Sequence, residues 1–174
     1  MMAWIRRIIT AAVVVLAVAA QTSVVSRWNL PGATPDLVLV VVIAFGMRHQ
    51  PARASMLGFA AGLLLDATPP SVGLMGLSAL TLTIVGYLAA QLRTDISRSP
   101  FGPLLFVAAA AIGSIVIRAL LGSLLGDPEV ALYRLPVVAL ATAVYSTLLG
   151  AVAIPIVRCL LSYLMPAPTE YVHR

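Results

Sequence analysis

Residues 35–66 have the sequence PDLVLVVVIAFGMRHQPARASMLGFAAGLLLD. Two charge-free apolar segments, 37–47 and 54–65, flank the polar loop 48–53, whose sequence is RHQPAR. At about 1.5 Å per residue, a helix needs about 20 residues to cross about 30 Å of hydrocarbon. Both segments are therefore short for a membrane crossing.

Two arrangements of this pair remain open: a re-entrant hairpin, or two short helices that extend into their flanks and cross completely. A re-entrant hairpin would hold Arg48, His49 and Arg53 at membrane depth. Each arginine costs about 2.5 kcal/mol or more near the membrane centre. Because two complete crossings place the same loop in water, the sequence favours two short crossing helices.

The composition of the chain indicates an integral membrane protein. Hydrophobic residues make up 61% of the 174 residues and charged residues 10%, whereas soluble domains carry roughly 25% charged residues. This leaves too little polar surface to cover a soluble fold, and disorder would need low hydrophobicity and high charge. The net charge of +5 comes from arginines without a basic run, unlike the concentrated basic patch of a nucleic-acid-binding surface.

Charge-free stretches predict an all-α membrane protein with six transmembrane helices in a single domain, residues 1–174. The expected helices cover residues 5–26, 35–48, 53–66, 72–92, 100–125 and 134–163, and residues 165–174 form a short cytoplasmic tail. Arginine asymmetry sets the orientation of such a protein. The arginines expected inside are Arg6, Arg7, Arg48, Arg53, Arg93, Arg98, Arg158 and Arg174, against Arg27 and Arg134 outside. Both termini are therefore expected in the cytoplasm, with Asp66 and Asp127 outside.

The first apolar segment has a second interpretation. Arg6-Arg7, an apolar stretch and Ala17-Val18-Ala19 resemble a signal peptide with its cleavage site. The stretch is longer than the apolar core of a typical signal peptide, however, and Trp4 and Trp28 bracket it as interfacial anchors would. We expect an uncleaved transmembrane helix.

Residues that could carry catalysis or bind a metal are few. Cys159 is the single cysteine, and His49 and His173 are the two histidines. The sequence therefore offers no disulfide framework, no thiolate metal site and no ligand pair at metal-binding spacing. No serine lies in a G-x-S-x-G setting. We expect a protein without enzymatic activity, metal or cofactor.

Small residues and one acid stand out in the third segment. Gly58 and Gly62 lie one turn apart on one helix face, a spacing that lets two helix backbones approach closely. Gly122 and Gly126 repeat this spacing. Intrachain packing and a partner interface both remain open as the role of these pairs.

Asp66 ends the third segment, where the helix macrodipole opposes an acid, so we expect it to have a partner or to cap a neighbour. Arg118 lies inside an apolar segment, where a charge is costly unless it is paired or hydrated. The two residues either pair, or Arg118 snorkels outward and Asp66 lies in water. If they do not pair, Asp66 could also order the backbone of the Pro69-Pro70 turn.

Prolines mark expected helix boundaries. Pro35-Asp36 precedes the second segment as a start signal, with proline near the first helical position and an acid favouring the helix N-terminus. Pro155 lies inside the sixth expected helix, which it should kink or end near Ile154.

Together these segments resemble the rod shape-determining protein MreD family. The resemblance rests on residues 35–92: Pro35-Asp36-Leu37-Val38-Leu39, then Gly58-Phe59-x-x-Gly62-Leu63-x-x-Asp66, then Gly73-Leu74-x-Gly76-Leu77-Ser78-Ala79-Leu80. It implies a non-catalytic scaffold in the bacterial inner membrane. Its partners would be a single-span MreC-like protein and membrane lipids, and, indirectly, the elongation transpeptidase, a RodA-like glycosyltransferase and cytoplasmic filaments.

The same resemblance implies a fold similar to the six-helix substrate-binding subunits of energy-coupling-factor transporters. Such a subunit, which binds a vitamin or metal, is therefore the alternative function. A vitamin pocket usually gathers polar and aromatic groups. Aromatic residues make up only 6% of this chain, which weakens the alternative.

Overall fold

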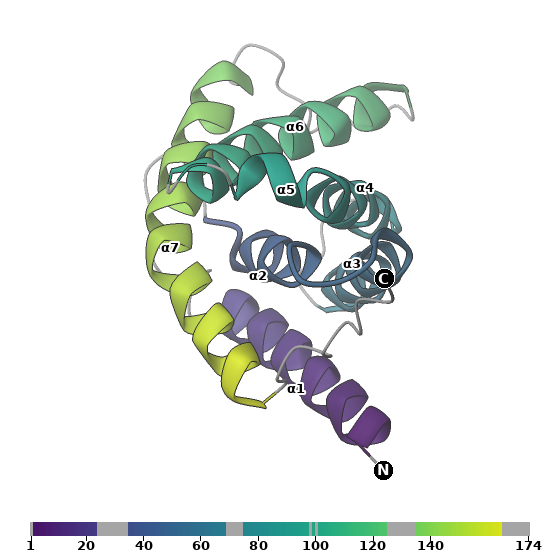
Figure 1. Ribbon diagram of the computed structural model, residues 1–174. Helices are drawn as coiled ribbons and strands as arrows, with labels where there is room; N and C mark the ends of the chain where they lie inside the picture. The colour runs from purple at the N-terminus through teal and green to yellow at the C-terminus, as the bar shows by residue number, and fades with distance from the viewer. Residues whose placement is uncertain are drawn as a thin grey trace.

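The structure is a computed structural model that describes residues 2–23, 35–68, 75–97, 99, 101–124 and 135–164. Within these ranges all regular structure is helical, which confirms the predicted all-α class. The helices are α1 (Met2–Ser23), α2 (Leu37–Gly46), α3 (Pro51–Ala67), α4 (Leu77–Gln91), the four-residue α5 (Arg93–Ile96), α6 (Gly102–Leu124) and α7 (Leu135–Leu164). Apart from α5 they form one bundle (Figure 1).

Each of the six expected segments overlaps one of the longer helices, and the differences lie at their ends. The short α5 occupies part of an expected loop. The fourth helix was expected from residue 72, whereas α4 begins at Leu77. Pro155 does not end the last helix, because α7 continues to Leu164. Figure 1 shows α7 curving around the side of the bundle, as a helix with an internal proline can.

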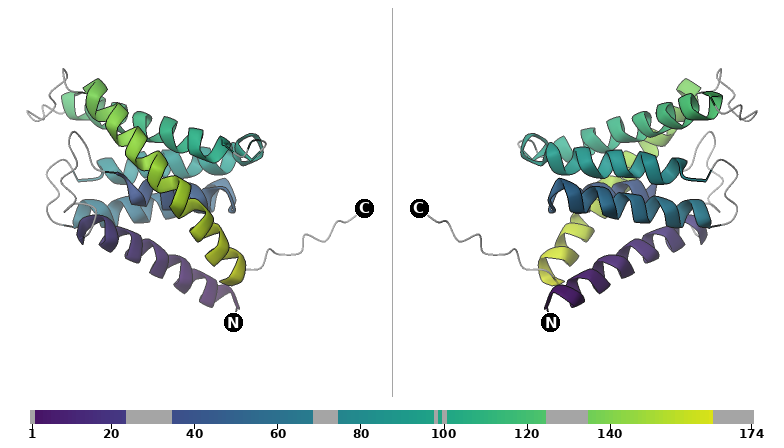
Figure 2. Two further views of the ribbon diagram at one scale, coloured as in Figure 1. Left: turned by 90° about the vertical axis from the view of Figure 1, so that its left-hand side faces the viewer. Right: turned by 90° about the vertical axis from the view of Figure 1, so that its right-hand side faces the viewer.

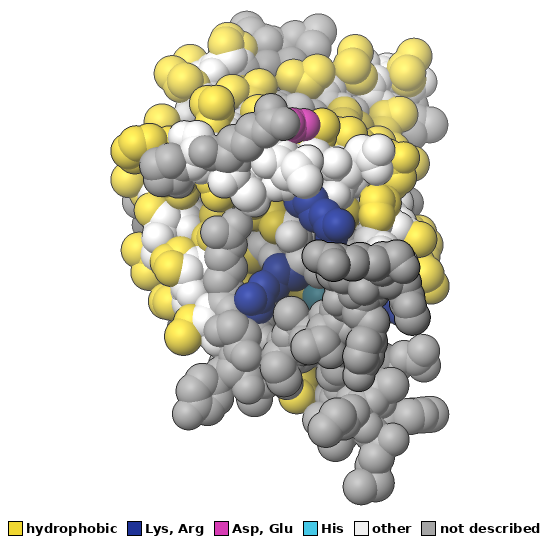
Figure 3. All heavy atoms as spheres, in the orientation of Figure 1, with side chains coloured by type: hydrophobic (Ala, Val, Ile, Leu, Met, Phe, Trp, Pro, Cys, Tyr) yellow, Lys and Arg dark blue, Asp and Glu magenta, His cyan; other side chains and the backbone are white. Residues whose placement is uncertain are grey.

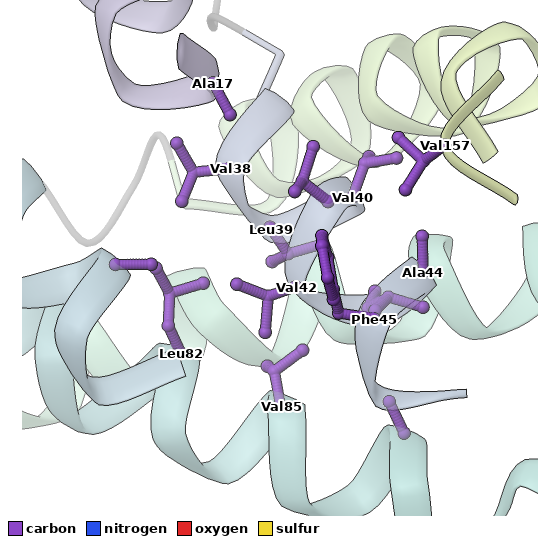
Figure 4. Close-up of a cluster of buried hydrophobic side chains, with 14 of the residues drawn as sticks. Ala17, Val38, Leu39, Val40, Val42, Ala44, Phe45, Leu82, Val85 and Val157 are labelled. Atoms are coloured by element: carbon purple, nitrogen blue, oxygen red, sulfur yellow. The ribbon is translucent and has the colours of Figure 1, made fainter. Parts of the chain in front are cut away.

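Helix α2 forms the centre of the bundle. From Val38 to Gly46 every residue of α2 is buried, because its surface is apolar on all sides and no face of it requires water. Figure 4 shows Ala17 of α1, Leu82 and Val85 of α4 and Val157 of α7 around this helix. Its ten residues span about 15 Å, half the thickness of the hydrocarbon. Protein rather than lipid therefore surrounds this short helix.

Helices α3 and α4 form the most extensive helix–helix contact in the described part of the chain. The buried residues of α3 are Ala54, Gly58, Ala61 and Gly62. All four are small, so the two backbones approach until they touch. Close packing of this kind takes the place of the hydrophobic effect, which does not drive association between helices in lipid.

Apolar side chains cover the outside of the bundle. Large exposed hydrophobic residues occur on all five outer helices; examples are Leu16, Met56, Tyr87, Leu105 and Leu140. Residues 102–121 and 136–157 are each long and apolar enough to cross a membrane, and shorter apolar helices cover residues 8–23, 37–46 and 77–91. An exterior of this composition suits lipid better than water.

Successive long helices run in opposite directions (Figure 2). The start of α1, the turn after α2, the short α5 and the end of α7 lie at one end of the bundle, which we call the arginine end because Arg48, Arg53 and Arg93 are exposed there. The N-terminal end of α2 lies at the opposite end. Figure 3 looks onto the arginine end, where basic side chains lie near the middle of the view and apolar ones along the top and the sides.

Candidate functional site

Four polar side chains from four helices meet where α2 begins. We call them the polar cluster: Gln21 of α1, Asp36 before α2, Arg118 of α6 and Ser146 of α7. Asp36 and Ser146 are buried. Polar groups buried in an apolar bundle need partners within the protein, and the cluster supplies them to one another.

Asp36 begins α2 as its N-cap residue. Its carboxylate Oδ1 accepts a hydrogen bond of 2.9 Å from the backbone N–H of Leu39. Its own backbone N–H donates to Oγ of Ser146 at 3.0 Å, across 110 residues of sequence. The first N–H groups of a helix have no partner within the helix, and at this buried end side chains must replace water.

Gln21 completes the capping of α2 from a neighbouring helix. Its Oε1 accepts a hydrogen bond of 2.8 Å from the backbone N–H of Val38, and its Nε2 donates to Asp36 Oδ1 at 3.4 Å. Two of the first three N–H groups of α2 are thus bound by carboxylate or amide oxygens. This network joins α1, α2 and α7 at one point.

Arg118 approaches the cluster from α6. Its Nη2 lies 3.9 Å from Asp36 Oδ2, and its side chain is 38% exposed against 11% for that of Asp36. It follows Val107, Ala111 and Ser114 along the buried face of α6 at helical spacing. Of the two alternatives for Asp66 and Arg118, the pair is not what the structure has, because the acid beside Arg118 is Asp36.

Asp66 serves a different helix end. Its Oδ2 accepts hydrogen bonds from the backbone N–H groups of Gly76 at 2.8 Å and Ala79 at 3.2 Å. Gly76 is the N-cap residue of α4 and has a left-handed φ of +103°, which glycine adopts without a steric penalty. Since Gly76 has no side chain to act as a cap, the acid at the end of α3 caps α4. An acid beside a helix N-terminus is also favoured by the macrodipole.

Two of the predicted glycines, Gly58 and Gly62, lie in the α3–α4 interface. A methyl group at Gly58 would overlap the carbonyl of Leu82, and one at Gly62 would overlap the backbone of Ala79. Sequence reasoning missed Gly86, where an added Cβ would lie 2.6 Å from the carbonyl oxygen of Ala54. It also missed Gly46 of α2, where an added Cβ would lie 2.8 Å from the side-chain Cβ of Ala89 in α4.

The remaining predicted residues lie outside the interface and the polar cluster, or outside the described residues. Pro35 is buried but lies one residue before the N-cap, not at the first helical position. Gly73, the Pro69-Pro70 turn, Gly126, Asp127 and the tail 165–174 fall outside the described residues. Gln21 and Ser146 were not predicted as site residues. Their one sequence signal is a polar side chain within a long apolar segment.

The chemistry of these sites is that of hydrogen bonding and charge pairing. In the described ranges, no three His, Cys, Asp or Glu side chains come together as a metal site would require. At the arginine end, His49 is half-buried, and its Nδ1 lies 3.0 Å from the carbonyl oxygen of Phe45. The side chains of these sites fix helix ends and hold helices together.

Comparison with known proteins matches the chain to a protein family. A family model described as rod shape-determining protein MreD matches residues 2–164. No curated protein and no solved structure matches the chain. The matched range covers every described helix, including the α3–α4 interface and all four residues of the polar cluster.

Proposed function

The chain belongs to the MreD family of rod shape-determining membrane proteins, and we propose that it is a non-catalytic scaffold of the cell-wall elongation complex. The observation that carries this proposal is the family match over residues 2–164. The side chains described above support it, because they cap and join helices. A protein that positions others in a membrane needs such a fixed shape more than it needs a reactive centre.

The proposed topology has six crossings of the bacterial inner membrane and both termini in the cytoplasm. The alternating direction of the long helices supports it (Figure 2). So does the exposure of Arg48, Arg53 and Arg93 at one end, because basic residues flanking membrane spans remain on the cytoplasmic side. In this topology the other helices surround α2 and separate it from lipid. A helix of ten residues can then take part in a membrane crossing although it is shorter than the hydrocarbon is thick.

The proposed direct partner is a single-span MreC-like protein. Through that partner the scaffold would reach the elongation transpeptidase and a RodA-like glycosyltransferase, and it would couple cytoplasmic filaments to peptidoglycan synthesis. The apolar outside of the bundle supports a partner that approaches within the membrane, since a single transmembrane helix packs laterally. The predicted residues Pro35, Asp36, Gly58, Gly62, Asp66, Gly73, Gly76 and Arg118 would preserve the shape that the partner recognises.

Affinity purification from the native membrane tests the function. The tagged chain, extracted in mild detergent, is expected to retain an MreC-like single-span protein, identified by mass spectrometry. An unrelated six-span protein carrying the same tag is the control. Co-purification with an ATPase module and a bound vitamin, without an MreC-like protein, would replace the scaffold with the transporter alternative.

Cysteine labelling tests the topology. In a Cys159→Ser background, single cysteines at Gln50 and Pro128 are treated with a membrane-impermeant maleimide in intact spheroplasts. We expect labelling at position 128 from outside, and at position 50 only after the membrane is opened. Labelling of position 50 from outside refutes the six-crossing orientation. Protection of positions 48 and 53 from both sides would favour the re-entrant hairpin.

A further inference from the structure

The Arg118 guanidinium group has unused hydrogen-bonding capacity. Hydrogen-bonded pairs between arginine and carboxylate have N···O distances of about 2.7–2.9 Å, whereas Nη2 of Arg118 lies 3.9 Å from Asp36 Oδ2. Within the described part of the chain, Nε of Arg118 is buried and has no hydrogen-bond partner. A buried charged donor without an acceptor is costly. The side chain nevertheless keeps 38% of its surface exposed, so a ligand can reach its exposed part, although not the buried Nε.

Asp36 cannot close this gap without disrupting the start of α2. Its Oδ1 is held by the backbone N–H of Leu39 and by the amide of Gln21. Turning the carboxylate toward Arg118 would break these bonds and leave a buried helix end uncapped. The carboxylate of Asp36 is therefore held in place by its capping role, and its Oδ2 faces the guanidinium of Arg118 at 3.9 Å.

The guanidinium of Arg118 and the carboxylate of Asp36 together favour a ligand that carries both charges. A simple anion is attracted by Arg118 and repelled by Asp36, and a simple cation experiences the reverse. A group that carries acceptor oxygens and N–H donors on one short linker complements both charges. Phosphoethanolamine has this form, because two carbons join its phosphate to its ammonium. Arginine donors match phosphate oxygens, and a carboxylate accepts hydrogen bonds from ammonium.

The position of Arg118 favours a lipid as the source of this group. The long apolar segment of α6 runs to Leu121 and the helix ends at Leu124, six residues beyond Arg118, so the long guanidinium side chain can reach the expected boundary between hydrocarbon and headgroups. Long basic side chains near helix ends extend to that boundary. We propose that Arg118 and Asp36 together bind the headgroup of an outer-leaflet phosphatidylethanolamine, with its phosphate on Arg118 and its ammonium on Asp36. This inference rests on the membrane topology proposed above.

Native mass spectrometry of the purified full-length protein tests the inference against three lipids. Phosphatidylethanolamine carries both groups, phosphatidylcholine carries a cation without N–H donors, and phosphatidylglycerol carries the phosphate without a cation. We expect phosphatidylethanolamine to bind about fivefold more tightly than either of the others, the scale of a partly exposed ion pair. Equal binding of the three, or preference for phosphatidylglycerol, overturns the inference.

Variants assign the preference to the two residues. Asp36→Asn retains an oxygen that can cap α2, because asparagine is as good an N-cap as aspartate, but it should lose the preference over phosphatidylglycerol. Arg118→Gln should weaken the binding of both phosphatidylethanolamine and phosphatidylglycerol. Asp66→Asn is the matched control, since it neutralises another helix-capping acid, and it should keep the wild-type preference. Circular dichroism checks the fold of each variant.

The remaining outcomes are decisive as well. If Asp36→Asn does not fold, unchanged lipid binding by Arg118→Gln still overturns the inference, and weakened binding supports it. Soluble phosphoethanolamine that binds as tightly as the lipid would exclude a lipid as the natural source. Retention of an MreC-like partner is measured separately. A wild-type protein that retains its partner but shows no lipid preference refutes this inference alone, whereas a wild-type protein that shows the preference but does not retain the partner refutes the scaffold alone.

Discussion

The α3–α4 interface and the polar cluster both hold helices together, but they do so in opposite ways. In the first, small residues bring backbones into contact, so that Gly58 and Gly62 have no space for even a methyl group. In the second, long side chains reach between helices, and the Arg118–Asp36 pair remains 3.9 Å apart. The first contact is steric, and the second is made of polar bonds over adjustable distances.

This difference predicts how each region tolerates substitution. A backbone-to-backbone contact cannot accommodate an added group, because neither backbone can move without shifting its whole helix. A network of side chains can rearrange after one member is lost, and its cost is limited to the bonds that are not replaced. Substitutions in the α3–α4 interface should therefore either leave the fold intact or abolish it, whereas substitutions in the polar cluster should lower the stability by smaller amounts.

Gly62→Leu should have the largest effect. Its Cβ alone would overlap the backbone of Ala79, and overpacking a core commonly costs about 1–3 kcal/mol even where side chains can move. We expect almost complete loss of folded protein, measured as the monodisperse peak in fluorescence-detected size-exclusion chromatography. Gly113→Leu in α6 is the matched control, since an added Cβ there meets no atom within 4 Å. Equal yields of the two variants would contradict the steric account of the interface.

Asp36→Ala should have the next largest effect. The substitution removes the N-cap of α2, worth about 0.5–2 kcal/mol, and leaves Arg118 without its acid. We expect a lower thermal unfolding midpoint in detergent, with Asp36→Asn recovering most of the loss because its amide oxygen can still accept from Leu39. If Asp36→Asn is as unstable as Asp36→Ala, charge rather than capping dominates the cluster.

The α3–α4 interface was easier to predict from the sequence than the polar cluster, because it depends on residues close together in the chain. Close helix packing can be recognised from the local sequence, because two glycines one turn apart lie on the same helix face whatever surrounds them. Gly58 and Gly62 were identified from that spacing. The α3–α4 partnership could also be expected from adjacency in the chain. The all-α class followed from composition, since only helices and closed barrels satisfy their backbone in lipid.

The polar cluster could not be predicted in the same way. Asp36 bonds to Ser146 across 110 residues, and nothing in either local sequence specifies the other. The sequence identified Arg118 as a charge that needs a partner, but choosing between Asp36 and Asp66 required the spatial order of α2, α3 and α6. The cap that Asp66 supplies to α4 was only partly foreseen, as an acid expected to cap a neighbour.

A double-mutant cycle would sharpen the assignment of Arg118. Asp36→Asn and Arg118→Gln should couple by about 0.5–1 kcal/mol, the range for a partly exposed pair. Asp66→Asn and Arg118→Gln should be additive within about 0.5 kcal/mol, because they share no partner. Unfolding free energies in mixed micelles of fixed composition provide the measurement. Coupling of Arg118 to Asp66 instead of Asp36 would contradict the structure of the cluster.

Asp66→Asn alone should have the smallest effect, although Asp66 joins two helices. One oxygen of Asp66, Oδ2, accepts from both Gly76 and Ala79, and an asparagine has one carbonyl oxygen that can accept twice. The cap therefore survives, and only the charge is lost at a helix N-terminus, which costs about 0.3–1 kcal/mol. Asp66→Ala removes the cap as well and should be less stable by about a further 1 kcal/mol. Thermal unfolding of the two variants side by side separates the contributions. If both lose the same stability, the hydrogen bonds to α4 contribute nothing, and the boundary between α3 and α4 depends on backbone packing alone.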